Sequence, residues 1–256
     1  ILSSGLFSTI KFFLKNAGKY DASIIGFDLQ NWKIYLGTLI ARIPIRIGHI
    51  QRHRSLKLAI LGLIQSLSLN SKIPVQDERH EIDLYLDLLE IENRPESIYK
   101  TEAPNILSLS DNSKKILSHN KFKLENYYIV QLSAANGGQT PKIWPKSNFQ
   151  MLLSKMINQD MKIIIVGDKN EREHSEEVLD GITKNIINLT GLVSLLDTIF
   201  LIKDAECIIC HDSGLMHIAD AYNRPLIALF GPGNLVKNYP KSKLSQVASI
   251  SMACSP

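Results

Sequence analysis

Short apolar runs alternate along this chain with segments whose apolar residues recur at helical spacing. In the second half, compact apolar runs occur at residues 127–132, 162–166, 186–189, 207–210 and 226–230. Runs of this length are typical of strands buried on both faces of a parallel sheet. The helical period fills the segments between them, at residues 147–158, 171–183, 194–205 and 215–222. Since parallel strands need such crossovers, the pattern predicts an α/β fold with a doubly wound sheet.

The first half carries the same alternation with fewer strands. The pattern predicts helices at 1–16, 31–41, 80–91 and 109–120 and strands at 22–29 and 43–47. Residues 92–105 contain two prolines and several polar residues, so we expect irregular chain there. We place the domain boundary after residue 123, which gives domains 1–123 and 124–256. The longest apolar run, 56–69, is interrupted by polar residues and is shorter than the roughly 20 residues that cross a bilayer.

Composition narrows the class of protein. The 256 residues suit one large or two small domains, and 45% hydrophobic with 21% charged residues excludes a disordered chain. A net charge of +4 is compatible with an anionic ligand and too small for a nucleic-acid-binding surface. Three cysteines provide no disulfide framework, which favours a reducing compartment. Cys207 and Cys210 form C-x-x-C, but strand residues three apart point to opposite faces, which argues against a metal or redox site.

The candidate chemistry lies in the stretch 206–234. Residues 211–214 form a sharp turn between a buried strand and a helix, and Pro225 ends that helix before the next strand. The first N–H groups of a helix, together with the positive end of its dipole, make such a turn a candidate anion site. The alternative is that Asp212 and Ser213 only cap the helix, as these residue types commonly do.

A family resemblance rests on this stretch. The sequence H-D-S-G-L-M-H-I-A-D-A at 211–221, followed by R-P-L-I-A-L-F-G-P-G-N at 224–234, resembles the signature of the lipopolysaccharide core heptosyltransferases, glycosyltransferase family 9. That family shows D-S/T-G-x-x-H-x-A-A and then a strand ending in F-G-P-T/G. The resemblance implies a GT-B type fold, in which two Rossmann-like doubly wound domains enclose a cleft, here with an incomplete N-terminal domain and a truncated C-terminus.

The resemblance also implies a reaction and its donor site. The reaction is inverting transfer of a heptose from ADP-heptose to a lipopolysaccharide core acceptor, without a metal or other cofactor. Lys142 matches the lysine of the family's K-x-W-P, which contacts the donor diphosphate, and Glu171 matches the carboxylate of G-x-x-x-E, which binds the ribose. The other implied donor-binding residues are Ser133, Asp212, Ser213, Gly214 and His217, the last as an ordering residue in the cleft. The alternatives are that Lys142 is a surface lysine and Glu171 a first-turn helix charge.

Basic residues 42–57 suggest an acceptor side. Arg46, Arg52 and Arg54 belong to this cluster, and they are candidates for contact with a phosphorylated, lipid-linked core oligosaccharide. The alternative is a solvated loop, as runs of charge usually are. The family resemblance implies a cytoplasmic enzyme in peripheral contact with the inner face of the inner membrane, and no nucleic-acid partner.

The catalytic base has no candidate in this sequence. The acceptor hydroxyl must be deprotonated, and the family uses an aspartate in a G-D loop of the N-terminal domain. Gly167-Asp168 is a G-D pair, but it lies in the predicted second domain. We therefore expect the base upstream of Ile1. Two alternative functions remain at this stage, namely a nucleotide-sugar epimerase on the same scaffold and a non-catalytic nucleotide-sugar-binding domain.

Overall fold

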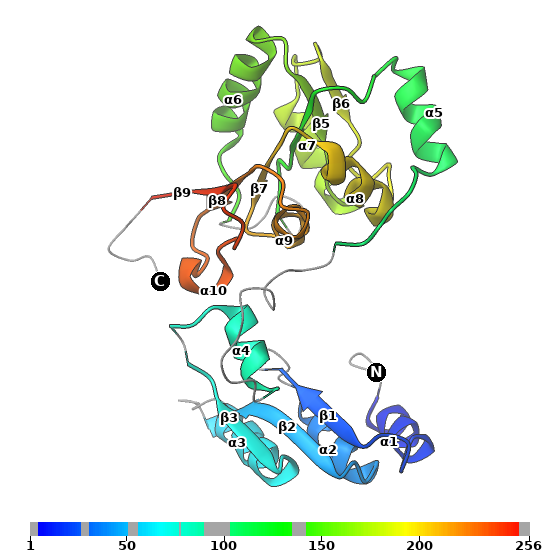
Figure 1. Ribbon diagram of the computed structural model, residues 1–256, viewed down its shortest axis with the longest axis vertical. Helices are drawn as coiled ribbons and strands as arrows, with labels where there is room; N and C mark the ends of the chain where they lie inside the picture. The colour runs from blue at the N-terminus through cyan, green and yellow to red at the C-terminus, as the bar shows by residue number, and fades with distance from the viewer. Residues whose placement is uncertain are drawn as a thin grey trace. The chain divides into compact units, whose positions relative to one another are not determined.

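The computed structural model describes residues 5–26, 31–50, 56–76, 78–89, 103–134 and 142–250, without the side chains of 56–59. The chain divides into two compact units, Ile1–Arg94 and Pro95–Pro256 (Figure 1). We describe each unit by itself. Among the described residues, no helix combines the length and the apolar character needed to cross a membrane.

The first unit is a small parallel sheet with helices. Its described elements are α1 (Leu6–Lys15), β1 (Ala22–Ile25), α2 (Trp32–Ile40), β2 (Ile45–Ile50), α3 (Leu56–Ser68), β3 (Ser71–Pro74) and α4 (Glu81–Asp87). The strands pair in parallel in the order β1-β2-β3. Tyr35 is fully buried between these helices, and its hydroxyl accepts a hydrogen bond of 3.0 Å from Gln65. The sequence pattern missed β3, because its four residues S-K-I-P are too few and too polar to give a strand signal.

The second unit carries the longer pattern of strands and helices. Its described elements are α5 (Asp111–His119), β4 (Tyr127–Val130), α6 (Lys146–Asn158), β5 (Lys162–Ile165), the 3₁₀ turn η2 (Lys169–Glu171), α7 (Arg172–Val178), β6 (Ile186–Asn188), α8 (Leu195–Asp204), β7 (Cys207–His211), α9 (Gly214–Ala221), β8 (Leu226–Phe230), α10 (Leu235–Asn238) and β9 (Ser245–Ser249). Every strand from β4 to β8 was predicted within two residues of its observed ends. The short α10 and the polar edge strand β9 were not predicted.

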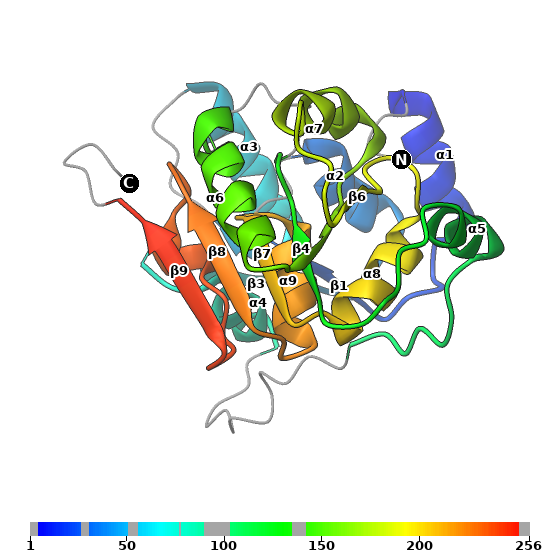
Figure 2. The same cartoon turned by 90° about the horizontal axis from the view of Figure 1, so that it is seen from above.

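The order of the strands creates a switch point in the second sheet. All its strands run parallel in the order β6-β5-β4-β7-β8-β9, and Figure 2 shows β9, β8, β7 and β4 side by side. Strands β5 and β6 follow β4 on one side of it. Strand β7 then pairs with the other side of β4, and β8 and β9 extend the sheet in that direction. Ligands of such sheets bind outside the carboxyl ends of the strands at this reversal. The predicted doubly wound sheet is thus confirmed, with its crevice between β4 and β7.

Alternation along the strands produces a separate core on each face of the sheet. Ile164 and Val166 face one core, formed with α5, α8 and α9, whereas Ile163 and Ile165 face the other, formed with α6 and α7. Figure 1 shows α6 and α8 on opposite sides of the strands. Because both faces are covered, the strands are apolar throughout, which is why the sequence pattern located them.

The division between the units lies earlier than the expected boundary after residue 123. Helix α5 packs on the second sheet, with Leu117 in the core that contains α8 and α9. The backbone N–H and hydroxyl of Ser110 donate to the Asp197 carboxylate at 2.7 and 3.0 Å. Burial alone would raise the pKa of Asp197. Hydrogen bonds from Ser110 and Ser194 have the larger effect and lower this pKa to about 2. These tertiary contacts are not visible in the sequence pattern, so the helix was assigned to the first domain.

Candidate functional site

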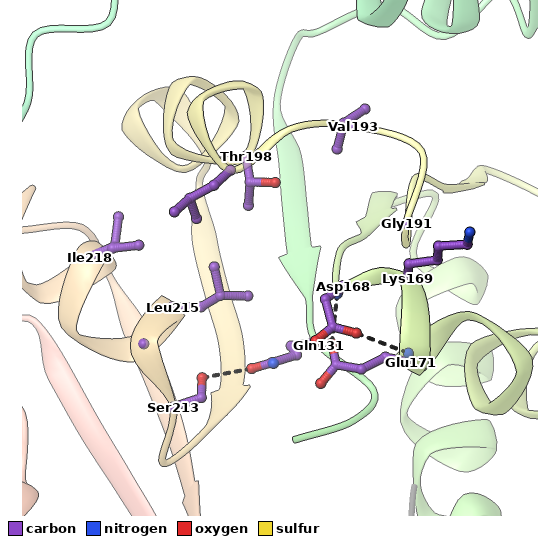
Figure 3. A pocket seen from close by; sticks show the side chains of 13 residues that line it. Gln131, Asp168, Lys169, Glu171, Gly191, Val193, Thr198, Ser213, Leu215 and Ile218 are labelled. Carbon is purple, nitrogen blue, oxygen red and sulfur yellow. Dashed lines mark hydrogen bonds between the residues drawn. The ribbon is translucent and has the colours of Figure 1, made fainter. Parts of the chain in front are cut away.

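A cavity of about 530 Å³ opens at the carboxyl edge of the second sheet (Figure 3). Its volume lies within the range of small-molecule sites. The loops after β4, β5, β6 and β7 all contribute to its lining, so the cavity lies at the switch point of the sheet. The lining residues are Gln131, Gly167, Asp168, Lys169, Glu171, Gly191, Val193, Leu195, Thr198, Ser213, Gly214, Leu215 and Ile218.

The bend after β7 presents the start of α9 to this cavity. Ser213 is the N-cap residue by position, yet its side chain makes no capping hydrogen bond. Its hydroxyl instead donates to the side-chain oxygen of Gln131 at 2.8 Å, as the dashed line in Figure 3 shows. The alternative that Asp212 and Ser213 only cap the helix is therefore wrong for Ser213. Among the described residues, no side chain caps the start of α9, although the Met216 N–H donates to the Ser213 carbonyl at 3.1 Å. A helix start without a side-chain cap favours an anion.

An ion pair lies beside the bend. Lys142 Nζ lies 2.7 Å from Asp212 Oδ2; the carboxylate side chain is 8% exposed and the lysine 41%. The lysine thus points toward the bend, as the sequence analysis required of a residue near the phosphates. Gly233 makes room for this carboxylate, because a Cβ there would stand 2.7 Å from Asp212 Oδ2.

Glu171 closes the opposite side of the cavity. It is 4% exposed, and its Oε2 accepts the backbone N–H of Asp168 at 2.9 Å within a capping box. Burial raises the pKa of Glu171, whereas hydrogen bonds from the Asp168 backbone and the Gln131 side chain oppose the rise. A Cβ on Gly167 would stand 2.4 Å from the same oxygen, so any larger residue there would force Glu171 to shift. Glu171 is a first-turn charge, as its alternative stated, and it lines the cavity as well.

The loop after β6 forms another wall. Gly191 has φ of +69°, and a Cβ there would lie 2.8 Å from Lys169 Cα, so both its backbone conformation and its surroundings call for glycine. Its N–H donates to the carbonyl of Gly167 at 3.0 Å, which joins the loops after β5 and β6. Val193 and Leu195, which follow on the chain, give this wall an apolar surface.

His211 connects two site loops beneath the bend. It is fully buried, its Nε2 accepts the backbone N–H of Trp144 at 3.0 Å, and its Nδ1 lies 3.2 Å from the carbonyl of Ser133. These partners fix the neutral tautomer that carries its proton on Nδ1. Burial lowers the pKa of His211 to about 4, with His174 contributing, although the bond to Ser133 acts the other way. The sequence analysis assigned no role to His211.

The predicted donor-binding residues are brought together to different degrees. Glu171, Ser213 and Gly214 line the cavity, and Lys142 and Asp212 pair beside it. Ser133 is buried, with its hydroxyl 3.4 Å from the Ala134 carbonyl. His217 is exposed on α9. The ligand-binding roles of these residues remain predictions.

The predicted acceptor residues lie in the first unit. The Arg46 guanidinium donates to the backbone carbonyls of Ser68 at 2.6 Å and of Ile43, contacts that hold the loops around β2. This arrangement favours a structural role for Arg46. Arg52 and Arg54 lie outside the described residues, so their acceptor-binding role remains a prediction.

Several lining residues were missed by the sequence analysis. Asp168 is one of them, and its D-x-x-E spacing to Glu171 is a capping-box pattern that the sequence does show. Gln131 ends an apolar run, and a polar side chain in such a run is a signal for a buried hydrogen-bonding role. Lys169 carries a charge at the rim, but Figure 3 shows its side chain directed away from Gln131 and Ser213.

The C-x-x-C pair lies on β7, as predicted. Cys210 is fully buried in the core with α8 and α9, and burial raises the pKa of its thiol. The alternation of the strand directs Cys207 to the other face. Within the part of the chain that the structure describes, no cluster of three His, Cys, Asp or Glu residues is placed to hold a metal ion.

The sequence comparisons with known proteins all indicate the same family. The model of glycosyltransferase family 9 (heptosyltransferase) matches residues 17–256. Lipooligosaccharide heptosyltransferase 2 of Haemophilus influenzae is 35% identical over 95 residues, which are 36% of this chain and 28% of that protein. Lipopolysaccharide heptosyltransferase 2 of Escherichia coli is 33% identical over 97 residues, with the same two shares. The matched stretch thus spans less than a third of the length of these relatives.

Solved structures agree on the fold. The structure of E. coli ADP-heptose lps heptosyltransferase II is similar with a TM-score of 0.71 and 22% identity, over 95% of this chain and 72% of that one. UDP-GlcNAc 2-epimerase of Methanocaldococcus jannaschii is also similar, at 0.57 and 16% over 97% and 73% of the two chains, so the fold alone does not separate transferase from epimerase. The predicted GT-B type fold is confirmed. Because the family model covers nearly the whole sequence, the chain belongs to glycosyltransferase family 9, the heptosyltransferases.

Proposed function

We propose that the second unit binds ADP-heptose in the cavity at the switch point and that the protein transfers the heptose, with inversion and without a metal, to a lipopolysaccharide core acceptor. Family membership supports the type of reaction. The cavity lies where doubly wound sheets bind nucleotides, and its volume suits a nucleotide sugar.

The observation that carries the proposal is the bend at the start of α9. No side chain of the described residues caps its N–H groups, and the Lys142 ammonium lies beside the bend through its pair with Asp212. N–H groups, the helix dipole and a cation together favour a diphosphate. A diphosphate between Lys142 and the backbone of Ser213 and Gly214 would complete this arrangement.

The ribose and the base of a nucleotide also have suitable partners in the cavity. Glu171 offers a buried carboxylate, which accepts hydrogen bonds from the hydroxyl groups of a ribose. The apolar side chains of Val193, Leu215 and Ile218 line another part of the cavity, where the flat face of a base would be excluded from water.

The chemistry follows from where charge develops. When the bond between the anomeric carbon and the diphosphate breaks, negative charge grows on the departing phosphate oxygen. The N–H groups at the start of α9 and the Lys142 ammonium would stabilise that charge, and this would remove the need for a metal ion. The acceptor hydroxyl needs a base. We assign that role to an aspartate of the family's G-D loop and to no residue that the structure describes.

Acceptor binding is the part of the proposal that rests on resemblance. We propose that a lipid-linked core oligosaccharide binds on the first unit, with Arg52 and Arg54 as candidate contacts, and that the protein works at the inner face of the inner membrane. Replacing both arginines with glutamine should weaken acceptor use without changing affinity for ADP.

Calorimetry with ADP, UDP and GDP tests the donor site. We expect ADP to bind the 256-residue chain more tightly than UDP or GDP, and Lys142→Ala to lower ADP affinity about tenfold or more, because a charge-assisted contact is worth about 1.5–3 kcal/mol. Lys155→Ala is the matched control, since Lys155 is exposed on α6 outside the cavity. Preference for UDP would favour the epimerase alternative. Equal affinity of Lys142→Ala and Lys155→Ala would contradict the proposed diphosphate site.

A further inference from the structure

Gln131 occupies a central place in the candidate site. It directly follows β4, and its backbone N–H donates to the carbonyl of Ile209 in β7 at 2.9 Å, so its main chain belongs to the switch point itself. Its side chain is 5% exposed and lines the cavity between the loops after β5 and β7. A polar side chain that is buried at such a place must have hydrogen-bond partners.

The Gln131 amide lies between two candidate donor-binding residues, Ser213 and Glu171, as Figure 3 shows. Its Oε1 accepts the Ser213 hydroxyl at 2.8 Å. The same amide lowers the pKa of Glu171 against the effect of burial. An ionised carboxylate only accepts hydrogen bonds, so the NH₂ end of the amide is the end that suits Glu171, and the oxygen end is the one that suits the Ser213 hydroxyl.

This orientation determines what Ser213 can offer to a ligand. A serine hydroxyl has one proton and two lone pairs, and the proton of Ser213 is already donated to Gln131. Its oxygen can therefore only accept further hydrogen bonds. An ionised phosphate oxygen has no proton to donate, so it gains nothing from this hydroxyl and must be bound by N–H groups and cations. A sugar or ribose hydroxyl, by contrast, can donate to it.

We propose that Gln131 is a positioning residue that sets the hydrogen-bonding polarity of the site. It holds Glu171 and Ser213 together as acceptors for hydroxyl groups of the nucleotide sugar, and it leaves the diphosphate to the backbone of the bend and to Lys142. This inference rests on the proposed function and specifies how that site separates hydroxyl groups from phosphates.

Two ligands separate this role from a merely structural one. ADP carries ribose hydroxyls and a diphosphate, whereas pyrophosphate carries only the phosphates. For Gln131→Met, which keeps the length of the side chain but cannot hydrogen-bond Glu171 or Ser213, we expect ADP affinity to fall about tenfold and pyrophosphate affinity to stay within about twofold. Ser213→Ala should also weaken ADP more than pyrophosphate, and it keeps the test open if Gln131→Met does not fold.

The pH dependence gives a second readout. Because the Gln131 amide opposes the rise in the pKa of Glu171, removing it should raise that pKa further. The loss of ADP affinity on acidification should therefore begin at a higher pH in Gln131→Met than in the wild type. A residue that served only packing would not move this profile.

The results of these binding measurements distinguish a failure of this inference from a failure of the proposed function. If the wild type binds ADP and neither variant changes the affinity for it, the inference is overturned and the diphosphate site stands. If Ser213→Ala weakens pyrophosphate as much as ADP, the hydroxyl donates to phosphate and the inference is again overturned. If the wild type binds neither ligand, the proposed function itself fails.

Discussion

Two acidic side chains flank the candidate site, and the protein stabilises them by different means. Glu171 accepts the neutral backbone N–H of Asp168 at 2.9 Å, and the neutral amide of Gln131 also lowers its pKa. Asp212 pairs with a cation, Lys142, at 2.7 Å. In both places the carboxylate lies close against a glycine, Gly167 for the first and Gly233 for the second, so the chain makes room for each charge in the same way.

The difference between the two sides corresponds to different ligand groups. Neutral donors leave the negative charge of Glu171 uncompensated, which burial makes costly and which raises its pKa. Such a carboxylate is suited to receive neutral hydroxyl groups. The pair of Lys142 and Asp212 has no net charge, and the half-exposed lysine can turn toward an incoming anion. Under the proposed function, this comparison suits hydroxyl groups to one side and phosphates to the other.

The largest expected effect concerns His211, which lies beneath the ion-paired side. Its pKa is near 6.5 in an unfolded chain and about 4 here, first because of burial. The unfolded state therefore binds a proton at a higher pH, and the stability present above pH 6.5 is lost as the pH falls toward 4. At about 1.4 kcal/mol per pKa unit, the loss is roughly 3 kcal/mol.

Denaturant unfolding of the wild type and His211→Asn across this pH range measures the effect. Asparagine does not titrate, so the free energy of unfolding of the variant should change less between pH 6.5 and 4. Trp144 fluorescence gives a local readout, because protonation of His211 at Nε2 removes the acceptor for the backbone N–H of Trp144. Parallel pH profiles for the two proteins would show that His211 is not the group responsible.

The next effect tests the side held by neutral donors. In Gly167→Ala the new Cβ would stand 2.4 Å from Glu171 Oε2 and 3.1 Å from Thr190, both buried. We expect the free energy of unfolding to fall by about 2 kcal/mol, as for other overpacked sites. Under the proposed function, ADP affinity should fall too, because Glu171 is displaced.

Gly233→Ala is the matched change on the ion-paired side. Its Cβ would meet Asp212 Oδ2 at 2.7 Å, and its other neighbours are 3.6 Å away, so a small rotation of Asp212 relieves the contact. We expect a smaller loss of stability than for Gly167→Ala in thermal or denaturant unfolding. The reverse order would mean that Asp212, not Glu171, is the more rigidly held carboxylate.

The sequence pattern predicted the parts of the site that depend on regular structure. Strands buried on both faces are apolar throughout, so β4, β5 and β7 were located, and parallel strands bring their carboxyl ends to one edge. The bend at 211–214 followed from the change of period between strand and helix. Polar edges gave no such signal, which is why β9, with the sequence S-Q-V-A-S, was missed.

Side-chain partnerships were beyond the reach of periodicity. Gln131 and His211 sit at the ends of apolar runs, and nothing in a linear pattern shows that one contacts Ser213 and the other the Trp144 backbone. Ser133 was expected to offer its hydroxyl to the donor, and its burial beside the Ala134 carbonyl is likewise a contact that a linear pattern does not show. Such pairings depend on the order of strands in the sheet, which the sequence alone did not provide.

The smallest expected effect on stability concerns the ion pair itself. Because Lys142 is 41% exposed, its pair with Asp212 contributes at most about 1 kcal/mol. Lys142→Met should cost more stability than Asp212→Asn, since it leaves a mostly buried carboxylate without this cation, whereas the second change leaves a lysine that reaches water. Denaturant unfolding of both variants measures the difference. Equal losses of stability would indicate that Asp212 is solvated well enough to need no cation. Glu171 and Asp212 would then differ only in the hydrogen-bond donors that each carboxylate has.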